Sequence, residues 1–167
     1  MKALFLAPAL LLATSASIAA AQKTSSNGPA VHEAAGPSAR SGADVKWGPV
    51  PAVLPAGAQI AVLEGNPFGE GVYTLRLSMP DGYTVPPHFH PTDEMVTVIS
   101  GDLLFAHGDD VDRAATTTLH TGGFVTAPKD MHHYVIANGA TVVQVHGMGP
   151  FAITYVHSKD DPRTGRM

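Results

Sequence analysis

Cysteine is absent from this 167-residue chain. The chain therefore forms neither disulfide bonds nor thiolate metal sites, and it lacks the residue that an acylated lipoprotein anchor requires. A protein without these cross-links depends on its own buried core for stability, and a domain of this length buries enough surface to provide one.

Clusters of one charge are absent as well. The chain has 10 basic and 14 acidic residues, with a formal net charge of −4, and no basic patch interrupts the sequence. Nucleic acids and anionic membrane surfaces are recognised through clustered Lys and Arg side chains. We therefore expect no nucleic acid among the partners of this protein.

The longest apolar run lies at the start of the chain. Lys2 gives a positive start, residues 3–12 are almost purely apolar, and residues 13–21 are small and end in three alanines. This order is typical of a secretory signal peptide, and the run is too short for a membrane anchor. We predict a signal peptide over residues 1–21, a periplasmic or secreted protein, and no membrane attachment after cleavage.

A flexible leader and one β domain are predicted for the rest of the chain. Residues 22–44 are rich in Ala, Gly, Ser and Pro and show no apolar periodicity, which is typical of a flexible leader. Residues 45–167 contain short apolar or alternating runs separated by turn signals, which favours a single all-β jelly-roll or sandwich. The runs are 59–63, 72–79, 95–100, 103–107, 116–120, 124–127, 133–136, 141–146 and 151–156.

The strongest chemical signal lies between two glycines, Gly82 and Gly101. His88 and His90 alternate along a predicted strand, so both imidazoles project from the same face. After a turn, Glu94 opens the next run, where its carboxylate can return towards the two imidazoles. Two imidazoles and a carboxylate on neighbouring strands are a suitable site for a divalent metal ion.

This segment resembles the first motif of the cupin superfamily, G-x5-H-x-H-x3-E-x6-G, at every defined position. A second cupin motif, G-x5-P-x-G-x2-H-x3-N, is matched by Gly122, Pro128 and His133. Asp130 stands where this motif has glycine, and Ala137 stands where it has asparagine.

The resemblance implies a double-stranded β-helix, or jelly-roll barrel, with a metal ion inside. The implied ligands are His88, His90, Glu94 and His133, and the implied ion is one divalent transition metal: Mn, Fe, Ni, Cu or Zn. Three histidines and one glutamate leave one or two coordination positions of an octahedral ion open, so the first hypothesis is a metal-dependent oxygenase acting on a small enol, phenol or flavonol-like compound. The alternatives are a non-oxidative isomerase or lyase and a non-catalytic binding module. A small-molecule partner follows from each reading, and a homodimer is among the assemblies considered.

Four further residues have two interpretations each. His132 competes with its neighbour His133, although the motif spacing favours His133. Glu94 can serve as a general base as well as a ligand. His146 either lines the pocket as a catalytic group or is a hydrogen-bonded barrel residue. Arg76 either faces inward, where it would neutralise an acidic substrate, or pairs with acidic groups on the surface.

Overall fold

A computed structural model describes residue 39 and residues 41–164. The predicted signal peptide lies outside these residues, as does most of the predicted leader. The last leader residues form a capped turn, in which the Ser41 hydroxyl accepts a hydrogen bond from the Ala43 amide and the Asp44 carboxylate accepts one from the Ser41 amide. Among the described residues, no helix combines the length and apolar character needed to cross a membrane.

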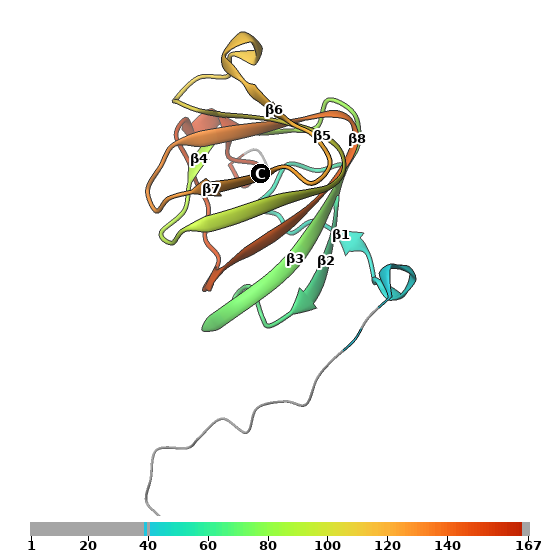
Figure 1. The fold of residues 1–167 in the computed structure, drawn as a ribbon. Helices are drawn as coiled ribbons and strands as arrows, with labels where there is room; N and C mark the ends of the chain where they lie inside the picture. The colour runs from blue at the N-terminus through green and yellow to red at the C-terminus, as the bar shows by residue number, and fades with distance from the viewer. Residues whose placement is uncertain (1–38, 40, 165–167) are drawn as a thin grey trace, which may run out of the picture. The chain divides into compact units, whose positions relative to one another are not determined.

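In the described part of the chain, strands form nearly all of the regular structure, and three single-turn 3-10 helices accompany them (Figure 1). The strands are β1 (Gly48–Pro49), β2 (Gln59–Glu64), β3 (Gly71–Met79), β4 (Thr84–Phe89), β5 (Glu94–His107), β6 (Thr117–Leu119), β7 (Phe124–Ala127), β8 (His133–Gly149) and β9 (Thr154–Tyr155). The 3-10 helices are η1 (Gly42–Asp44), η2 (Arg113–Ala115) and η3 (Ser158–Asp160).

The long strand β8 organises the sheet. Its C-terminal half pairs with β3 and its N-terminal half pairs with β4, while β5 pairs with it along most of its length. β5 also pairs with β6 and β7, and all of these pairings are antiparallel. In Figure 1 the strands curl around the interior of the domain. This arrangement confirms the predicted all-β jelly-roll class.

Two predicted turns are bends within continuous strands. The predicted runs are interrupted near Gly101 and near Gly139, but β5 and β8 continue through these glycines and the chain does not reverse at either place. Both glycines have positive φ, 77° and 80°, and the pairing of β5 with β8 shifts register around Ser100 and resumes at Asp102 and Asn138. The local sequence favours a change of direction, but pairing on both sides of each bend keeps the strands continuous.

Strand β4, which was expected above as the strand of His88 but is absent from the apolar runs, contains Pro86 and Pro87. Proline has no amide hydrogen for a ladder hydrogen bond, so it is found at edges and at irregular points of a sheet. The pairing of β4 with β8 shifts register between Val85 and His88, which is the interval that contains the two prolines. The irregularity lets the strand reach His88 despite them.

Alternate residues of the long strands form the core. Leu75 from β3, Val96 and Val98 from β5, and Val143 and Val145 from β8 are all buried in one cluster. Full burial of each such side chain stabilises the fold by about 1.5–3 kcal/mol. The core therefore fixes the strands whose ends carry the candidate site.

Candidate metal centre

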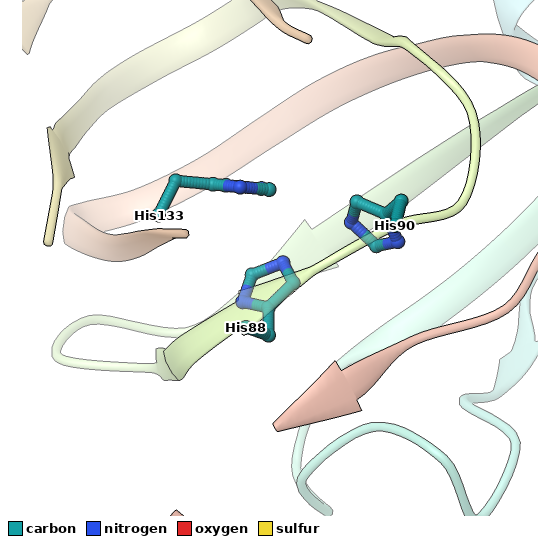
Figure 2. A group of neighbouring side chains, drawn as sticks. All are labelled: His88, His90 and His133. Carbon is teal, nitrogen blue, oxygen red and sulfur yellow. The ribbon is translucent and has the colours of Figure 1, made fainter. Parts of the chain in front are cut away.

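Three histidines meet at one end of this core. His88 lies on β4, His90 follows the end of β4, and His133 begins β8. All three are buried, and one ring nitrogen from each lies within 4.8 Å of the others. Figure 2 shows the three rings directed towards a common space. Residues from two distant parts of the chain thus form a triad with the geometry of a metal site.

Backbone carbonyl groups orient all three imidazoles. A carbonyl only accepts hydrogen bonds, so the Nδ1 atom of each ring carries the hydrogen and Nε2 keeps its lone pair for the common space. The accepting carbonyls belong to Pro86 for His88 (2.7 Å), Ala152 for His90 (2.7 Å) and Met131 for His133 (2.9 Å).

Glu94, the first residue of β5, joins the triad. Its Oε1 lies 3.6 Å from His90 Nε2, and its Oε2 lies 3.6 Å from His133 Nε2. Each carboxylate oxygen therefore faces one imidazole. The structure brings together all four residues that the cupin resemblance implies as ligands.

The surroundings of the site favour the unprotonated forms of two of its side chains, His88 and Glu94. Burial, together with the neighbouring His133 and His90, lowers the pKa of His88 to about 3. Burial acts to raise the pKa of Glu94, but the polar contact with His133 and the charges of the histidines outweigh it and lower this pKa to about 2. A metal ion needs neutral imidazoles and an ionised carboxylate, so both shifts favour metal binding.

The surroundings of two imidazole nitrogens indicate that the site suits a metal ion. The Nε2 atoms of His90 and His133 are buried and have no hydrogen-bond partner. An unsatisfied buried polar atom costs about 1–3 kcal/mol. A divalent ion in the common space would bind both lone pairs, so the buried triad is a site that can hold one.

Acidification of the metal-free protein should reveal this burial. Unfolded His88 takes up a proton near pH 6.5, but the folded protein resists until about pH 3, so stability is fully present above pH 6.5 and falls below it. The lowered pKa of Glu94 acts in the same direction below about pH 4.5. The expected loss from His88 approaches 1.4 kcal/mol per pH unit, measured by urea unfolding between about pH 7.5 and 4.5. His88→Gln should flatten the slope, and an unchanged slope in that variant would contradict the prediction.

His132 lies outside the triad. Its ring stacks on Phe89, with centroids 5.0 Å apart, and its Nδ1 lies 2.6 Å from Asp109 Oδ1. Phe89 points away from the metal side of β4 because side chains alternate along a strand. Of the two adjacent histidines, the structure thus brings only His133 to the candidate site.

Neither Arg76 nor His146 lines the pocket beside the three histidines. Their interpretation as catalytic residues in that pocket is therefore corrected. Leu75 and Leu77 line the pocket, so the alternation along β3 turns Arg76 to the opposite face. There its Nε donates a hydrogen bond to Gln144 (3.0 Å). His146 Nδ1 lies 3.0 Å from the Thr74 hydroxyl on the same face.

A pocket opens beside the metal centre. Apart from His88, His90, Glu94 and His133, every residue that lines it is apolar. The apolar lining comprises Pro51, Leu54, Ile60, Pro67, Phe68, Leu75, Leu77, Met79, Val85, Val96, Leu103, Val135, Val143, Val145, Phe151 and Ile153. Such a combination of an apolar wall and a few convergent polar groups is typical of a small-molecule site.

Two aromatic residues near the metal centre, Phe151 and Tyr73, were not predicted from the sequence. Phe151 contributes to the pocket wall, and its ring lies 5.2 Å from that of His90. Tyr73 lies close enough to Glu94 for the carboxylate to raise its pKa, in addition to the larger effect of burial. The alternation of Tyr73 with Leu75 could have placed Tyr73 on the inner face, but no sequence signal connects Phe151 with the centre.

The turn before His133 contains an unusual backbone conformation. Asp130 has a φ of 61°, and it is the only non-glycine residue with positive φ among the described residues. It occupies the place of the glycine in the second cupin motif. Its amide donates a hydrogen bond to the His90 carbonyl (2.9 Å), so the turn also supports the first motif.

Substitution of Asp130 should distinguish backbone conformation from side-chain chemistry. Asp130→Val should lower the free energy of unfolding by about 1–2 kcal/mol, because a β-branched residue is strained at positive φ. Asp130→Gly should change it by less than about 0.5 kcal/mol, since relief of strain offsets the greater entropy of the unfolded chain. Chemical denaturation measures both values. Equal losses in the two variants would show that the carboxylate is what the turn requires.

Comparison with known proteins identifies the fold family. Residues 75–148 match the family model described as the cupin domain. This part of the chain has the cupin fold. The match includes the histidine pair, Glu94 and His133, and it confirms the resemblance drawn from the two motifs.

One curated relative matches part of the chain. A germin-like protein 9-1 from Oryza sativa subsp. japonica is 36% identical over 79 residues, which are 46% of this chain and 32% of the relative. The chain thus spans about a third of the length of that curated relative.

Two solved structures share the fold across most of the domain. The polyketide cyclase RemF from Streptomyces resistomycificus has 17% identity and a TM-score of 0.63, over 78% of this chain and 93% of RemF. A candidate acetylacetone dioxygenase from Methylibium petroleiphilum has 19% identity and a TM-score of 0.57, over 75% of this chain and 85% of the other. At these identities the likeness establishes the fold of the cupin domain.

Proposed function

We propose that this cupin domain binds one divalent transition metal ion through His88, His90, Glu94 and His133. The observation that carries this proposal is the pair of buried Nε2 atoms, on His90 and His133, that have no hydrogen-bond partner. We assign Glu94 to metal binding because its two carboxylate oxygens lie 3.6 Å from the Nε2 atoms of His90 and His133.

The proposed reaction is the oxygenation of a small enol or phenol. When bound, a redox-active ion supplies Lewis acidity and a site for O₂. The residues of the chain hold the substrate in an apolar pocket, exclude water from it and keep the imidazoles fixed through their backbone hydrogen bonds. The name of the Methylibium relative, which refers to acetylacetone, agrees with an enol substrate.

Oxygen consumption tests this reaction directly. Protein purified without added metal is first analysed for its elements, then loaded separately with Mn, Fe, Ni, Cu or Zn. Acetylacetone, catechol and a flavonol serve as probes in an oxygen electrode. Oxygen uptake is expected from the protein loaded with a redox-active ion and from a His120→Ala control loaded in the same way, but neither from the Zn form nor after chelation. Full metal occupancy without uptake of oxygen with any probe would contradict the oxygenase proposal.

A non-oxidative reaction is the second candidate. RemF, whose name describes a cyclase of polyketides, shares the fold with the higher TM-score of the two structures, and the apolar pocket suits an enol of that kind equally well. Consumption of an enol probe by the loaded protein without uptake of oxygen would favour this candidate. Binding of the probe without any consumption would favour a binding module instead.

We also propose that the protein is exported and that the segment 1–21 is removed. The support is the positive start, the short apolar run and the small residues before position 22. N-terminal sequencing of the protein recovered from an extracytoplasmic fraction would test this. A mature protein that retains the segment, or that stays with the cytoplasm, would contradict it.

A further inference from the structure

The wall of the pocket carries no charge away from the metal centre. Among residues 41–164, neither Lys nor Arg lines it, and Arg76 is hydrogen-bonded to Gln144 on the opposite face of the sheet. A carboxylate bound away from the metal ion would therefore be desolvated without a partner, which is strongly unfavourable.

The charge at the centre indicates how much negative charge a ligand can bring. Three neutral imidazoles and the Glu94 carboxylate leave a divalent ion with one uncompensated positive charge. A ligand with one anionic chelating group, such as an enolate or a phenolate, would neutralise it. A second anionic group would have no cation to pair with on the pocket wall.

One residue of the wall is exposed to solvent. Phe68 lines the pocket, yet 58% of it is accessible. It projects from a loop formed around Asn66, whose side-chain Oδ1 accepts a hydrogen bond from the Phe68 amide (3.1 Å) and whose carbonyl accepts one from the Gly69 amide (3.0 Å). An exposed aromatic ring beside an apolar pocket gains free energy when a ligand covers it.

The loop that carries Phe68 is seated firmly on a neighbouring segment. The Phe151 amide donates a hydrogen bond to the Pro67 carbonyl. At Gly149 the two segments are so close that an added Cβ would lie 2.1 Å from the Gly69 carbonyl oxygen. The position of Phe68 beside the pocket is therefore defined by the backbone on both sides.

We propose that the pocket selects a ligand with a single anionic chelating group and an apolar body, and that Phe68 is the specificity-determining residue that covers this body. This inference rests on the proposed metal centre. It narrows the substrates to monoanionic, hydrophobic enols and phenols, and it excludes small dicarboxylates and sugar acids.

Alkyl hydroxamic acids, which bind metal ions as monoanions, provide the test. Calorimetry with the Co²⁺-loaded protein should show affinity that rises about fourfold per buried methylene, or about two hundredfold from acetohydroxamate to hexanohydroxamate. Succinohydroxamate, which carries a carboxylate on a chain of similar length, should bind at least about tenfold more weakly than pentanohydroxamate.

Two phenylalanine variants isolate the role of the ring. Phe68→Ala should reduce the preference for hexanohydroxamate over acetohydroxamate about tenfold, while the affinity for acetohydroxamate stays within about twofold. Phe124→Ala is the matched control, because Phe124 is 57% exposed and does not line the pocket. It should leave both affinities unchanged.

The possible failures separate the two proposals. Equal affinities for alkyl hydroxamates of every chain length, acetohydroxamate included, would overturn the selectivity and leave the metal centre in place. Equal affinities for succinohydroxamate and pentanohydroxamate would have the same consequence. An unaltered preference in Phe68→Ala would overturn the role of that residue. Failure of the protein to bind Co²⁺ would overturn both proposals, whereas failure of the loaded protein to bind any hydroxamate would overturn the selectivity alone.

Discussion

Alanine in place of His88, His90 or His133 should each lower metal affinity by more than about a hundredfold. The loss should exceed the 10–100-fold effect typical of residues that only orient a metal ligand, because each variant removes a direct bond to the ion. Competition with a chromophoric chelator measures the affinity, and elemental analysis gives the occupancy. Because His88, His90 and His133 each direct one ring nitrogen to the same space, the three effects should be similar.

Two other histidines provide the controls for this experiment. The side chain of His120 is 77% exposed and pairs with Asp102, so His120→Ala should bind metal as the unmodified protein does. His132→Ala should also retain metal, because its ring stacks on Phe89 outside the triad. Loss of metal in His132→Ala combined with retention in His133→Ala would reverse the assignment of the third histidine.

Gly101→Ala should lower the free energy of unfolding by about 2–4 kcal/mol. Gly101 has a φ of 77°, which an alanine adopts only at a cost of about 1–2 kcal/mol. An added Cβ would also lie 2.4 Å from the Ala140 carbonyl oxygen and 2.9 Å from the Thr141 hydroxyl. Since most of this contact is with backbone, the bend of β5 against β8 would have to open. Urea unfolding of the metal-free protein measures the change.

Gly139 provides a matched control for the same bend. Its φ is 80°, but no atom lies within 4 Å of the position that a Cβ would occupy. Gly139→Ala should therefore lose only the conformational contribution, about 1–2 kcal/mol. Equal losses in the two variants would show that close packing at Gly101 adds nothing to the stability of the bend.

The triad was predictable because its information is local. The spacing of His88, His90 and Glu94 combines the two-residue period of a strand with a short turn, and both operate within a few residues. The motif spacing likewise distinguished His133 from His132. The all-β class followed from the succession of short apolar runs and turn signals.

Other features depend on contacts between segments that are distant in the sequence. The phase of β3 decides that Arg76 faces outward, and this phase is set by the burial of Leu75 and Leu77 rather than by the arginine itself. The sequence around Gly101 and Gly139 resembles a turn, but whether the chain reverses or bends depends on the partner strand. The carbonyl groups that orient the imidazoles are backbone atoms, so no side-chain pattern predicts them.

Two segments that line the pocket, the loop around Phe68 and the segment around Phe151, differ in how freely their sequences can change. The hydrogen bond from His90 Nδ1 to the Ala152 carbonyl ties the metal centre to the segment that carries Phe151 and Ile153. A mutation that moves this segment therefore also moves an imidazole of the centre. The loop around Phe68 contacts this segment through the hydrogen bond from the Phe151 amide to the Pro67 carbonyl, but among the described residues no hydrogen bond joins the loop directly to the three histidines. Ligand preference can thus evolve, or be engineered, at Phe68 while the metal chemistry is inherited intact, whereas changes around Phe151 alter both together.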